Sequence, residues 1–233
     1  MNFPNDLKKR NQYILDRVRD GSIEIEWVPI TYAAEGNVGI FTVTADALKI
    51  DGVRVNVTAF LQQQIADVLD CSLLTPRLAD LIHLNAEITI DPCFRPIDSS
   101  TQVMIDQSKA VDAKIPEGCG GKLVSTVGKH WVLDAQLDTV VGKAVNYGWH
   151  VPTSPYKGVK AYNGTLPGIK VIQPNATAHN PQHTDYSQVC VLVRRSCQIN
   201  GTMCTLDSVL SDPALASLVS HQGPLRVHRQ PGI

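Results

Sequence analysis

The glycine-rich stretch PEGCGG, residues 116–121, divides this sequence into two halves with different hydrophobic patterns. Before it, helix-capping signals and helical periodicity are mixed with strand-like runs. After it, short apolar runs are separated by irregular loops, which is typical of antiparallel strands. Because helices and strands are segregated, the sequence predicts an α+β fold, with a helix-rich mixed first half and a strand-rich antiparallel second half. We expect a single compact domain over residues 1–233, with a subdivision near residues 114–122 as the alternative.

Capping and turn residues place the elements of the first half. Thr58 and Thr75 each precede an apolar run and can cap a helix, and Pro76 occupies a first helical position, where its missing N–H costs nothing. The Asp51-Gly52 pair lies between two alternating apolar runs and predicts a hairpin turn. We expect helices over residues 5–19 with Asn5 as the cap, 59–70, 76–87, 100–113 and 205–221, the last broken at Pro213. We expect strands over residues 23–30, 38–50, 53–57, 129–137, 144–151, 168–174 and 186–199.

The composition is that of a soluble globular protein, since 43% of the residues are hydrophobic, 18% are charged and the formal net charge is −1. This balance lacks the basic excess of a nucleic-acid-binding protein, so no nucleic-acid partner is expected. The first residues contain no apolar signal-peptide core, and no apolar run has the length of a membrane helix. We therefore expect a cytoplasmic protein without a membrane partner. Association with a virion, or release by lysis, is the alternative.

The six cysteines show no C-x-x-C spacing, which argues against a zinc ribbon or a thioredoxin-like motif. Cys190 lies in a strand-like run and is expected to be buried. Cys197 and Cys204 flank QINGTM, a pattern typical of a hairpin turn, so a bridge between them is geometrically feasible. Because the cytoplasm keeps thiols reduced, we expect both to be free there.

Polar residues of catalytic type concentrate in the second half. In the predicted strand over residues 144–151, strict alternation places Tyr147 and Trp149 on one face and Gly148 and His150 on the other. His150 thus stands at the end of a strand, and Gly148 leaves room beside it for a ligand. Strand ends and the loops that follow them commonly carry functional sites.

A second polar stretch is TAHNPQHTDYSQ, residues 177–188. Pro181 disfavours a helix here, so His179 and His183 cannot be two ligands on one helix face. We expect both histidines in a loop before the next strand. Asp185 follows His183 by two residues and shares a face with it if the segment is extended.

A site formed where these strands end would bring together two or three imidazoles and a carboxylate. Such ligands can bind zinc and leave one coordination position open for water. The candidate metal ligands are His150, His179, His183 and Asp185. Zinc lowers the pKa of its bound water to ~7 and supplies a nucleophile for hydrolysis. The candidate catalytic residues are His150, His179 and Asp185, with Lys129 and Tyr147 stabilising developing negative charge.

The leading hypothesis is a hydrolase that uses this His/Asp cluster, either around a metal-activated water or as acid/base groups, on a small-molecule, peptide or glycan substrate. The alternative is a non-catalytic structural or binding protein, such as a virion component, in which the cluster only rigidifies loops. A second alternative is a Cys–His hydrolase with Cys71 as nucleophile. Thr75-Pro76 is the better helix start, however, so Cys71 is expected to be structural. The stretch 116–121 matches no phosphate-binding signature and is expected to be a flexible connection.

At NYGWH and HTDYSQ the sequence resembles a group of uncharacterised bacterial and phage-type proteins, which carry a Y-G-W-H strand end and, further on, a histidine followed by D-Y-S. The resemblance extends to DCSLLTPRLADLI, residues 70–82, and to Lys129. It implies a shared fold and points to His150, His179 and Asp185, whereas a tyrosine is equally acceptable at position 183. It implies no particular activity, and it suggests a peptide or cell-wall-type substrate only through the phage-like character of the group.

Overall fold

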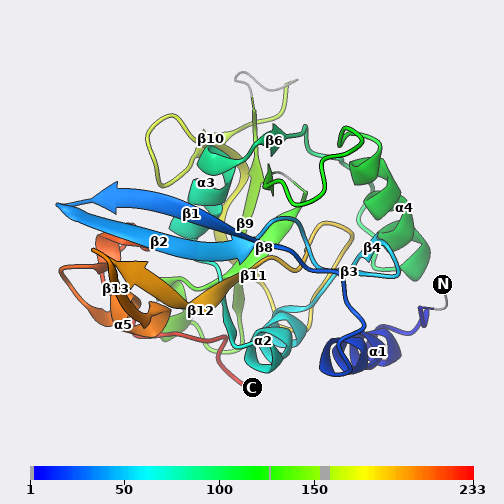
Figure 1. The fold of residues 1–233 in the computed structure, drawn as a ribbon. Coiled ribbons are helices and arrows are strands. Elements are labelled where there is room, and N and C mark those ends of the chain that lie inside the picture. Colours follow the sequence, from blue (N-terminus) through cyan, green and yellow to red (C-terminus); the bar gives the residue numbers. More distant parts are fainter. Residues whose placement is uncertain (1–2, 126, 153–157) are drawn as a thin grey trace.

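The computed structural model describes residues 3–125, 127–152 and 158–233, which form an α+β fold (Figure 1). Its helices are α1 (Leu7–Arg19), α2 (Ala59–Val68), α3 (Pro76–Asn85), α4 (Thr101–Asp112) and α5 (Leu206–Ser211), with the 3-10 turns η1 (Ala135–Asp138) and η2 (Ala216–Leu218). Its strands are β1 (Trp27–Ala34), β2 (Asn37–Thr44), β3 (Lys49–Ile50), β4 (Val53–Arg54), β5 (Cys71–Leu73), β6 (Ile88–Thr89), β7 (Val124–Ser125), β8 (Lys129–Val132), β9 (Ala144–His150), β10 (Tyr162–Asn163), β11 (Lys170–His179), β12 (Leu192–Ile199) and β13 (Thr202–Thr205).

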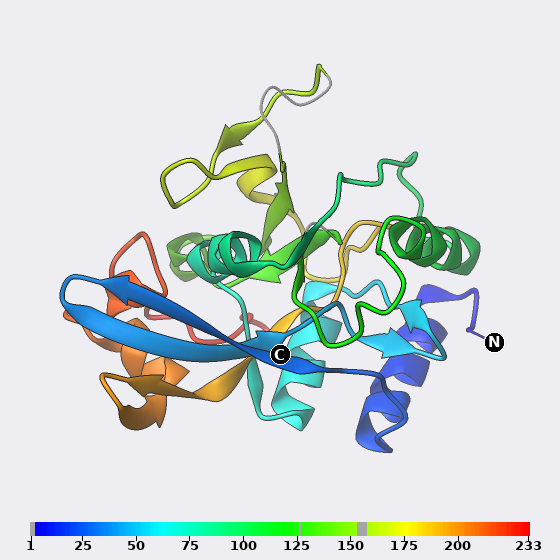
Figure 2. The ribbon, with the colours of Figure 1, turned by 45° about the horizontal axis from the view of Figure 1, so that its top comes forward.

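β12 is the strand around which the larger sheet is built. The sheet has the order β1-β2-β12-β13, and the first three residues of β12 also pair with β5. All of these pairs are antiparallel, and they join strands from both halves of the sequence. The smaller sheet, β10-β11-β9-β8, is built from the second half alone. Figures 1 and 2 show the long β1–β2 hairpin beside the orange strands β12 and β13.

The two main sheets meet just after β5. Leu74 forms a parallel bridge with Val132 of β8, and the Leu133 N–H donates to the Leu74 carbonyl at 2.8 Å. α3 begins two residues later and packs against β1 of the larger sheet and β9 of the smaller one. This position places Asp80, in the middle of α3, in the interior between the sheets with no exposed surface.

The local signals in the sequence produce the expected caps. The Thr58 and Thr75 hydroxyls accept from the third backbone N–H of α2 and α3, as helix-capping threonines do. α1 is capped by the Asp6 carboxylate rather than by Asn5, because the helix begins at Leu7. Positive φ angles of 49° and 76° at Asp51 and Gly52 form the turn between β3 and β4.

The interior position of β9 determines what its polar residues can contact. All seven residues of β9 are buried, since the strand lies between β11 and β8 and under α3. β11 is longer than expected: it continues past Pro174 to His179 through two register irregularities. His179 is therefore the last residue of a strand, and the expectation of a loop at this position is wrong. Among the residues described, no helix is both long and apolar enough to cross a bilayer.

Candidate functional site

β8 separates two groups of polar side chains. One group lies on the side of β8 that Lys129 and Trp131 face, and we call it the Asp185 cluster (Lys129, His179, His183, Asp185 and Ser187). Lys129 contacts Asp185, and the Trp131 ring contacts the rings of His179 and His183. His130, between them in sequence, faces the other side of the strand and lines a small void beside His150. That side holds what we call the Asp80 cluster (Asp80, His83, Tyr147, His150 and Thr165).

A kink in β9 decides which of its side chains enter the Asp80 cluster. Gly148 and Trp149 have positive φ angles of 136° and 51°, and the Trp149 N–H donates to the Gly128 carbonyl at 3.3 Å. The kink interrupts the alternation of the strand, so Tyr147 and His150 both contact Asp80. The expectation that they lie on opposite faces is therefore wrong. The Trp149 ring turns the other way and lies 5.3 Å from the Lys129 ammonium.

The Asp80 carboxylate accepts four hydrogen bonds. The Tyr147 hydroxyl and His150 Nε2 each lie 2.7 Å from Oδ1, while the Thr165 backbone N–H and hydroxyl lie 2.5 and 2.7 Å from Oδ2. Burial would raise the pKa of Asp80, but these hydrogen bonds outweigh burial and hold the pKa below its usual value. Asp80 is therefore ionised, and His150 Nε2 carries a proton that it donates. Burial, and then the charge of Asp80, raises the pKa of Tyr147, which stays a neutral donor.

Two further histidines, His83 and His130, lie near His150. The His83 ring stacks on His150 with centroids 4.9 Å apart, and His83 Nδ1 lies 2.7 Å from the Ser125 hydroxyl. Burial, and then the charge of His150, lowers the pKa of His83 to about 4 and that of His130 to about 3. Both imidazoles are therefore neutral at pH 7. His130 borders a void of about 10 Å³, a size that suits a single water molecule.

The Asp185 cluster is held together by one carboxylate near the surface. Asp185 Oδ1 accepts from the Ser187 backbone N–H and hydroxyl at 2.8 and 2.5 Å, which fixes the orientation of the carboxylate. Asp185 Oδ2 lies 3.6 Å from His183 Nε2 and 3.9 Å from Lys129 Nζ. The His179 and His183 rings stack in parallel, with centroids 4.0 Å apart and an angle of 6°. Both rings stand edge-on to the buried Trp131 ring, at 6.1 and 6.5 Å.

The protonation states of this cluster follow from its surroundings. Burial would raise the pKa of Asp185, but Lys129 and the Ser187 hydrogen bonds outweigh burial and lower the pKa. Burial lowers the pKa of Lys129 although Asp185 opposes this effect. Burial, followed by the charges of His183 and Lys129, lowers the pKa of His179, which is therefore neutral at pH 7. The His183 side chain is 29% exposed while Asp185 beneath it is buried, so a fixed carboxylate faces an imidazole that solvent can contact.

The structure brings Lys129, His179, His183 and Asp185 together, but it separates His150 from them. In the β9–β11 pair, His150 is opposite Val171 and His179 is opposite Ala144, so the two histidines lie at opposite ends. The expected four-ligand zinc set is therefore wrong in its inclusion of His150, and Tyr147 is bound to Asp80 instead of facing the Asp185 cluster. Over residues 3–125, 127–152 and 158–233, no group of three or more His, Cys, Asp or Glu side chains is arranged to hold a metal ion.

Cys71 has the surroundings of a structural thiol. It lies in β5 instead of at a helix N-terminus and has no exposed surface. Its thiol donates to the Leu69 carbonyl at 3.2 Å, and burial raises its pKa to about 11. Because the thiolate is the nucleophile, a raised pKa and full burial argue against a Cys–His hydrolase that uses Cys71.

Four residues of the Asp80 cluster and its surroundings were not identified from the sequence: Asp80, His83, Ser125 and Thr165. One of them carried a signal, because Asp80 sits within the apolar helix segment RLADLI. A carboxylate on an apolar helix face is almost never buried without partners, so it indicates a buried polar contact. The partners of Asp80 could not be named, since they come from β9 and the segment after β10.

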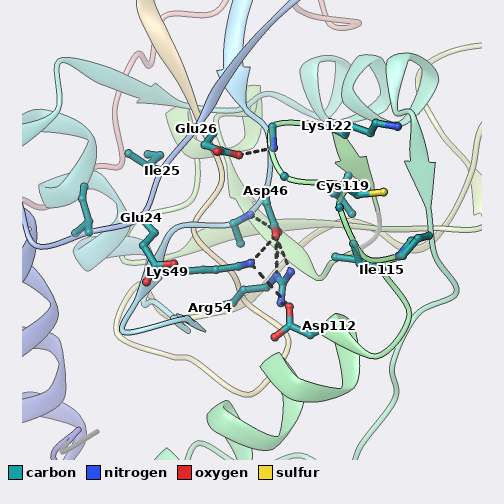
Figure 3. A pocket seen from close by; sticks show the side chains of 17 residues that line it. Glu24, Ile25, Glu26, Asp46, Lys49, Arg54, Asp112, Ile115, Cys119 and Lys122 are labelled. Carbon is teal, nitrogen blue, oxygen red and sulfur yellow. Dashed lines mark hydrogen bonds and ion pairs between the residues drawn. The ribbon is translucent and has the colours of Figure 1, made fainter.

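The glycine-rich stretch lines a cavity of about 640 Å³ instead of forming a simple connection (Figure 3). At its base, the Arg54 guanidinium donates to both oxygens of Asp46 and to Asp112 Oδ1. Glu26 Oε2 accepts a hydrogen bond from the Gly121 N–H at 2.6 Å. This contact holds the glycine-rich stretch against the residues that directly precede β1. The volume falls within the range of small-molecule sites. Neither the Asp80 cluster nor the Asp185 cluster lines this cavity.

Comparison with known proteins gives no family for this chain: no family model, no curated protein and no solved structure matches it. The geometry of the two clusters and of the cavity therefore carries any statement about function.

Proposed function

We propose that this protein is a hydrolase whose general base is His183, oriented by Asp185. The observation that carries the proposal is the contact of 3.6 Å between the fixed, buried Asp185 carboxylate and the partly exposed His183 ring. This distance exceeds that of a hydrogen bond, and catalytic contacts of this kind commonly shorten when substrate binds. The Asp80–His150 pair is closer, but both side chains are almost fully buried and cannot touch a substrate.

In the proposed reaction, Asp185 faces Nε2 of His183, so the other ring nitrogen, Nδ1, takes a proton from the attacking water. The imidazolium that forms is stabilised by the Asp185 charge, and it returns the proton to the leaving group. The Lys129 ammonium stabilises negative charge that develops on the substrate oxygen. His179, stacked on His183 and neutral, fixes the plane of the base. A peptide or cell-wall-type substrate is part of the proposal and rests on the resemblance to phage-type proteins.

Hydrolysis of chromogenic esters, a peptide library and peptidoglycan fragments by the purified protein tests the proposal. We expect His183→Gln and Asp185→Asn to lower the rate by ~10² or more. The control is His228→Gln, whose side chain contacts Ser211 and Leu225 near the C-terminal segment. Thermal melts of all variants separate lost activity from lost folding. Absence of hydrolysis by the unmodified protein, or full activity of His183→Gln, would overturn the proposal.

The sequence also leads us to expect zinc as the source of the attacking water, and the purified protein can be tested for it. Metal content is measured on protein purified without a histidine tag, and hydrolysis is measured with and without a chelator. Stoichiometric zinc that is lost from His179→Ala would favour a metal-activated water. Activity that is unchanged by the chelator would favour the metal-free acid/base route.

A second candidate function, a non-catalytic small-molecule-binding protein, is favoured by the cavity of about 640 Å³ that neither cluster lines (Figure 3). Gly120 lines the cavity, and a Cβ atom added at this position would meet no atom within 4 Å, so a larger side chain has open space in which to begin. Gly120→Phe should therefore obstruct the cavity without disturbing the fold. Ligands from a compound library that raise the melting temperature of the unmodified protein, but not that of Gly120→Phe, would support this function.

A further inference from the structure

Cys197 and Cys204 lie directly opposite each other on the antiparallel strands β12 and β13. Their Sγ atoms are 3.5 Å apart. The two-residue turn Asn200–Gly201, with positive φ angles of 50° and 83°, fixes this register. We propose that Cys197 and Cys204 are a site of reversible disulfide formation and that a small disulfide of the glutathione type is the oxidant.

The backbone geometry fits a disulfide without rearrangement. Residues directly opposite in an antiparallel pair have Cα atoms roughly 4.5–5.5 Å apart, and disulfides join Cα atoms roughly 4.4–6.8 Å apart. The sulfurs must approach from 3.5 Å to the covalent distance of about 2.0 Å, which a rotation of the side chains provides. The strands themselves can keep their hydrogen bonds.

The two thiols differ in access, and this sets the order of the steps. Cys197 is buried, whereas Cys204 is half-buried on the edge strand β13. Burial, and then the neighbouring Cys204, raises the pKa of Cys197 to about 12, so Cys197 is the poorer initial nucleophile. The Cys204 thiolate attacks one sulfur of the oxidised small disulfide and expels one glutathione thiolate. Cys197 then loses its proton and attacks Cys204 Sγ, which expels the second glutathione thiolate.

The atoms and electrons of this exchange balance. Two protein thiols are oxidised to one disulfide, and one molecule of oxidised glutathione is reduced to two molecules of the thiol. The two protons released by the cysteines are taken up by the two glutathione thiolates. Reduced glutathione drives the same steps in reverse.

The other cysteines supply an internal contrast. Cys71 and Cys190 have no exposed surface, and burial raises the pKa of both thiols. Cys93 is buried in a loop, where its sulfur lies 3.7 Å from the Ala110 carbonyl. Cys119 is half-buried in the glycine-rich stretch. An accessible thiol such as Cys119 can form a mixed disulfide with glutathione, but Cys197 and Cys204 are the pair whose sulfurs are placed to join.

The experiment exposes the folded protein to oxidised glutathione at about pH 8, then denatures it in the presence of an alkylating reagent so that every free thiol is trapped, and maps the peptides by mass spectrometry under non-reducing conditions. We expect a cross-linked peptide that contains Cys197 and Cys204, with a mass lower by two hydrogen atoms, and alkylated Cys71 and Cys190. Titration with mixtures of reduced and oxidised glutathione should show a reversible transition of this cross-link.

The matched control is Cys197→Ser, in which Cys204 should instead carry a stable glutathione adduct. Thermal melts of this variant and of Cys204→Ser verify that both remain folded. Recovery of both cysteines as alkylated thiols, or of a glutathione adduct on Cys204 without a cross-link in the unmodified protein, would overturn the proposal. The readout is independent of hydrolysis, so it stands or fails separately from the proposed function.

Discussion

The Asp80 carboxylate and the His150 imidazole, 70 residues apart in the sequence, are joined by a hydrogen bond of 2.7 Å in the interior. The same carboxylate accepts three further hydrogen bonds from Tyr147 and Thr165. One side chain thus connects α3, β9 and the segment after β10. Such a carboxylate is a strong determinant of stability, because its removal leaves several buried donors without a partner.

We predict that Asp80→Asn lowers the free energy of unfolding by ~1–3 kcal/mol or more, the cost typical of leaving buried donors without an acceptor. The amide keeps the shape of the side chain, but it removes the negative charge. Its NH2 group also faces groups of Tyr147, His150 or Thr165 that are themselves hydrogen-bond donors. Urea unfolding measures the change. Asp138→Asn, at an exposed position in η1, is the control and should stay within ~0.5 kcal/mol. Equal stability of the two variants would contradict this role of Asp80.

We predict that stability falls as the pH drops below about 6.5, because buried histidines must remain neutral in the folded state. Burial lowers the pKa of His130 to about 3, whereas a histidine in the unfolded chain titrates near 6.5. Between these values the unfolded state binds a proton that the folded state does not, so one such group costs up to ~1.4 kcal/mol per pH unit. Above about pH 6.5 the contribution is constant.

The measurement is the free energy of unfolding from pH 7.5 to about 5.5, above the range in which most carboxylates titrate. His130→Gln should flatten the slope relative to the unmodified protein. His83 has its pKa lowered to about 4 and contributes in the same direction, so part of the slope should remain. An unchanged slope in His130→Gln would show that His130 does not titrate as its burial implies.

We predict that Gly128→Ala is strongly destabilising and that Gly120→Ala is not. A Cβ at Gly128 would lie 2.5 Å from the Ser187 carbonyl oxygen and 2.8 Å from Val189, so the backbone of one segment must move. Such overpacking costs about 1–3 kcal/mol or more. Because Ser187 holds the Asp185 carboxylate, activity should fall as well. At Gly120 a Cβ meets nothing within 4 Å, so thermal melts of the two variants should differ clearly.

We predict different costs for His179→Ala and Asp185→Ala. Asp185 is buried and accepts from Ser187, so its removal should cost about 1–3 kcal/mol, similar to Val191→Ala in the core. His179 is half-buried at the end of β11, and its loss should stay within about 0.5 kcal/mol while activity falls. Thermal melts beside the hydrolysis assay give both quantities. If His179→Ala melts as low as Val191→Ala, the histidine stack is structural, and the role of His179 in positioning the His183 ring is wrong.

The sequence predicted those features of the fold that depend on neighbouring residues. The caps at Thr58 and Thr75 and the turn at Asp51-Gly52 need only a few consecutive residues, and they are confirmed. The kink in β9 could not be predicted, because it depends on a contact between Trp149 and a distant glycine, Gly128. Without the kink, regular alternation assigns Tyr147 and His150 to opposite faces.

The part of the candidate site that depends on neighbouring residues was predicted, and the part that depends on distant segments was not. His183 and Asp185 are two residues apart, so their proximity follows from short-range geometry. The assignment of His150 to this group depended on how β9 pairs with β11, and the antiparallel register puts His150 and His179 at opposite ends. Asp80 was missed because its four donors come from segments that only tertiary structure brings together.

The position of β12 has a consequence for the nascent chain on the ribosome. The hydrogen bond from the Leu192 N–H to the Thr44 hydroxyl spans 148 residues, and β12 also supplies the partner of β5. At ordinary rates of translation, β2 and β5 emerge roughly six to thirty seconds before the strand that pairs with them. During that interval the β1–β2 hairpin presents an unpaired, largely apolar edge to other newly made chains. Slowed synthesis between residues 73 and 192 should therefore favour aggregation over folding, and holding chaperones should have their largest effect there.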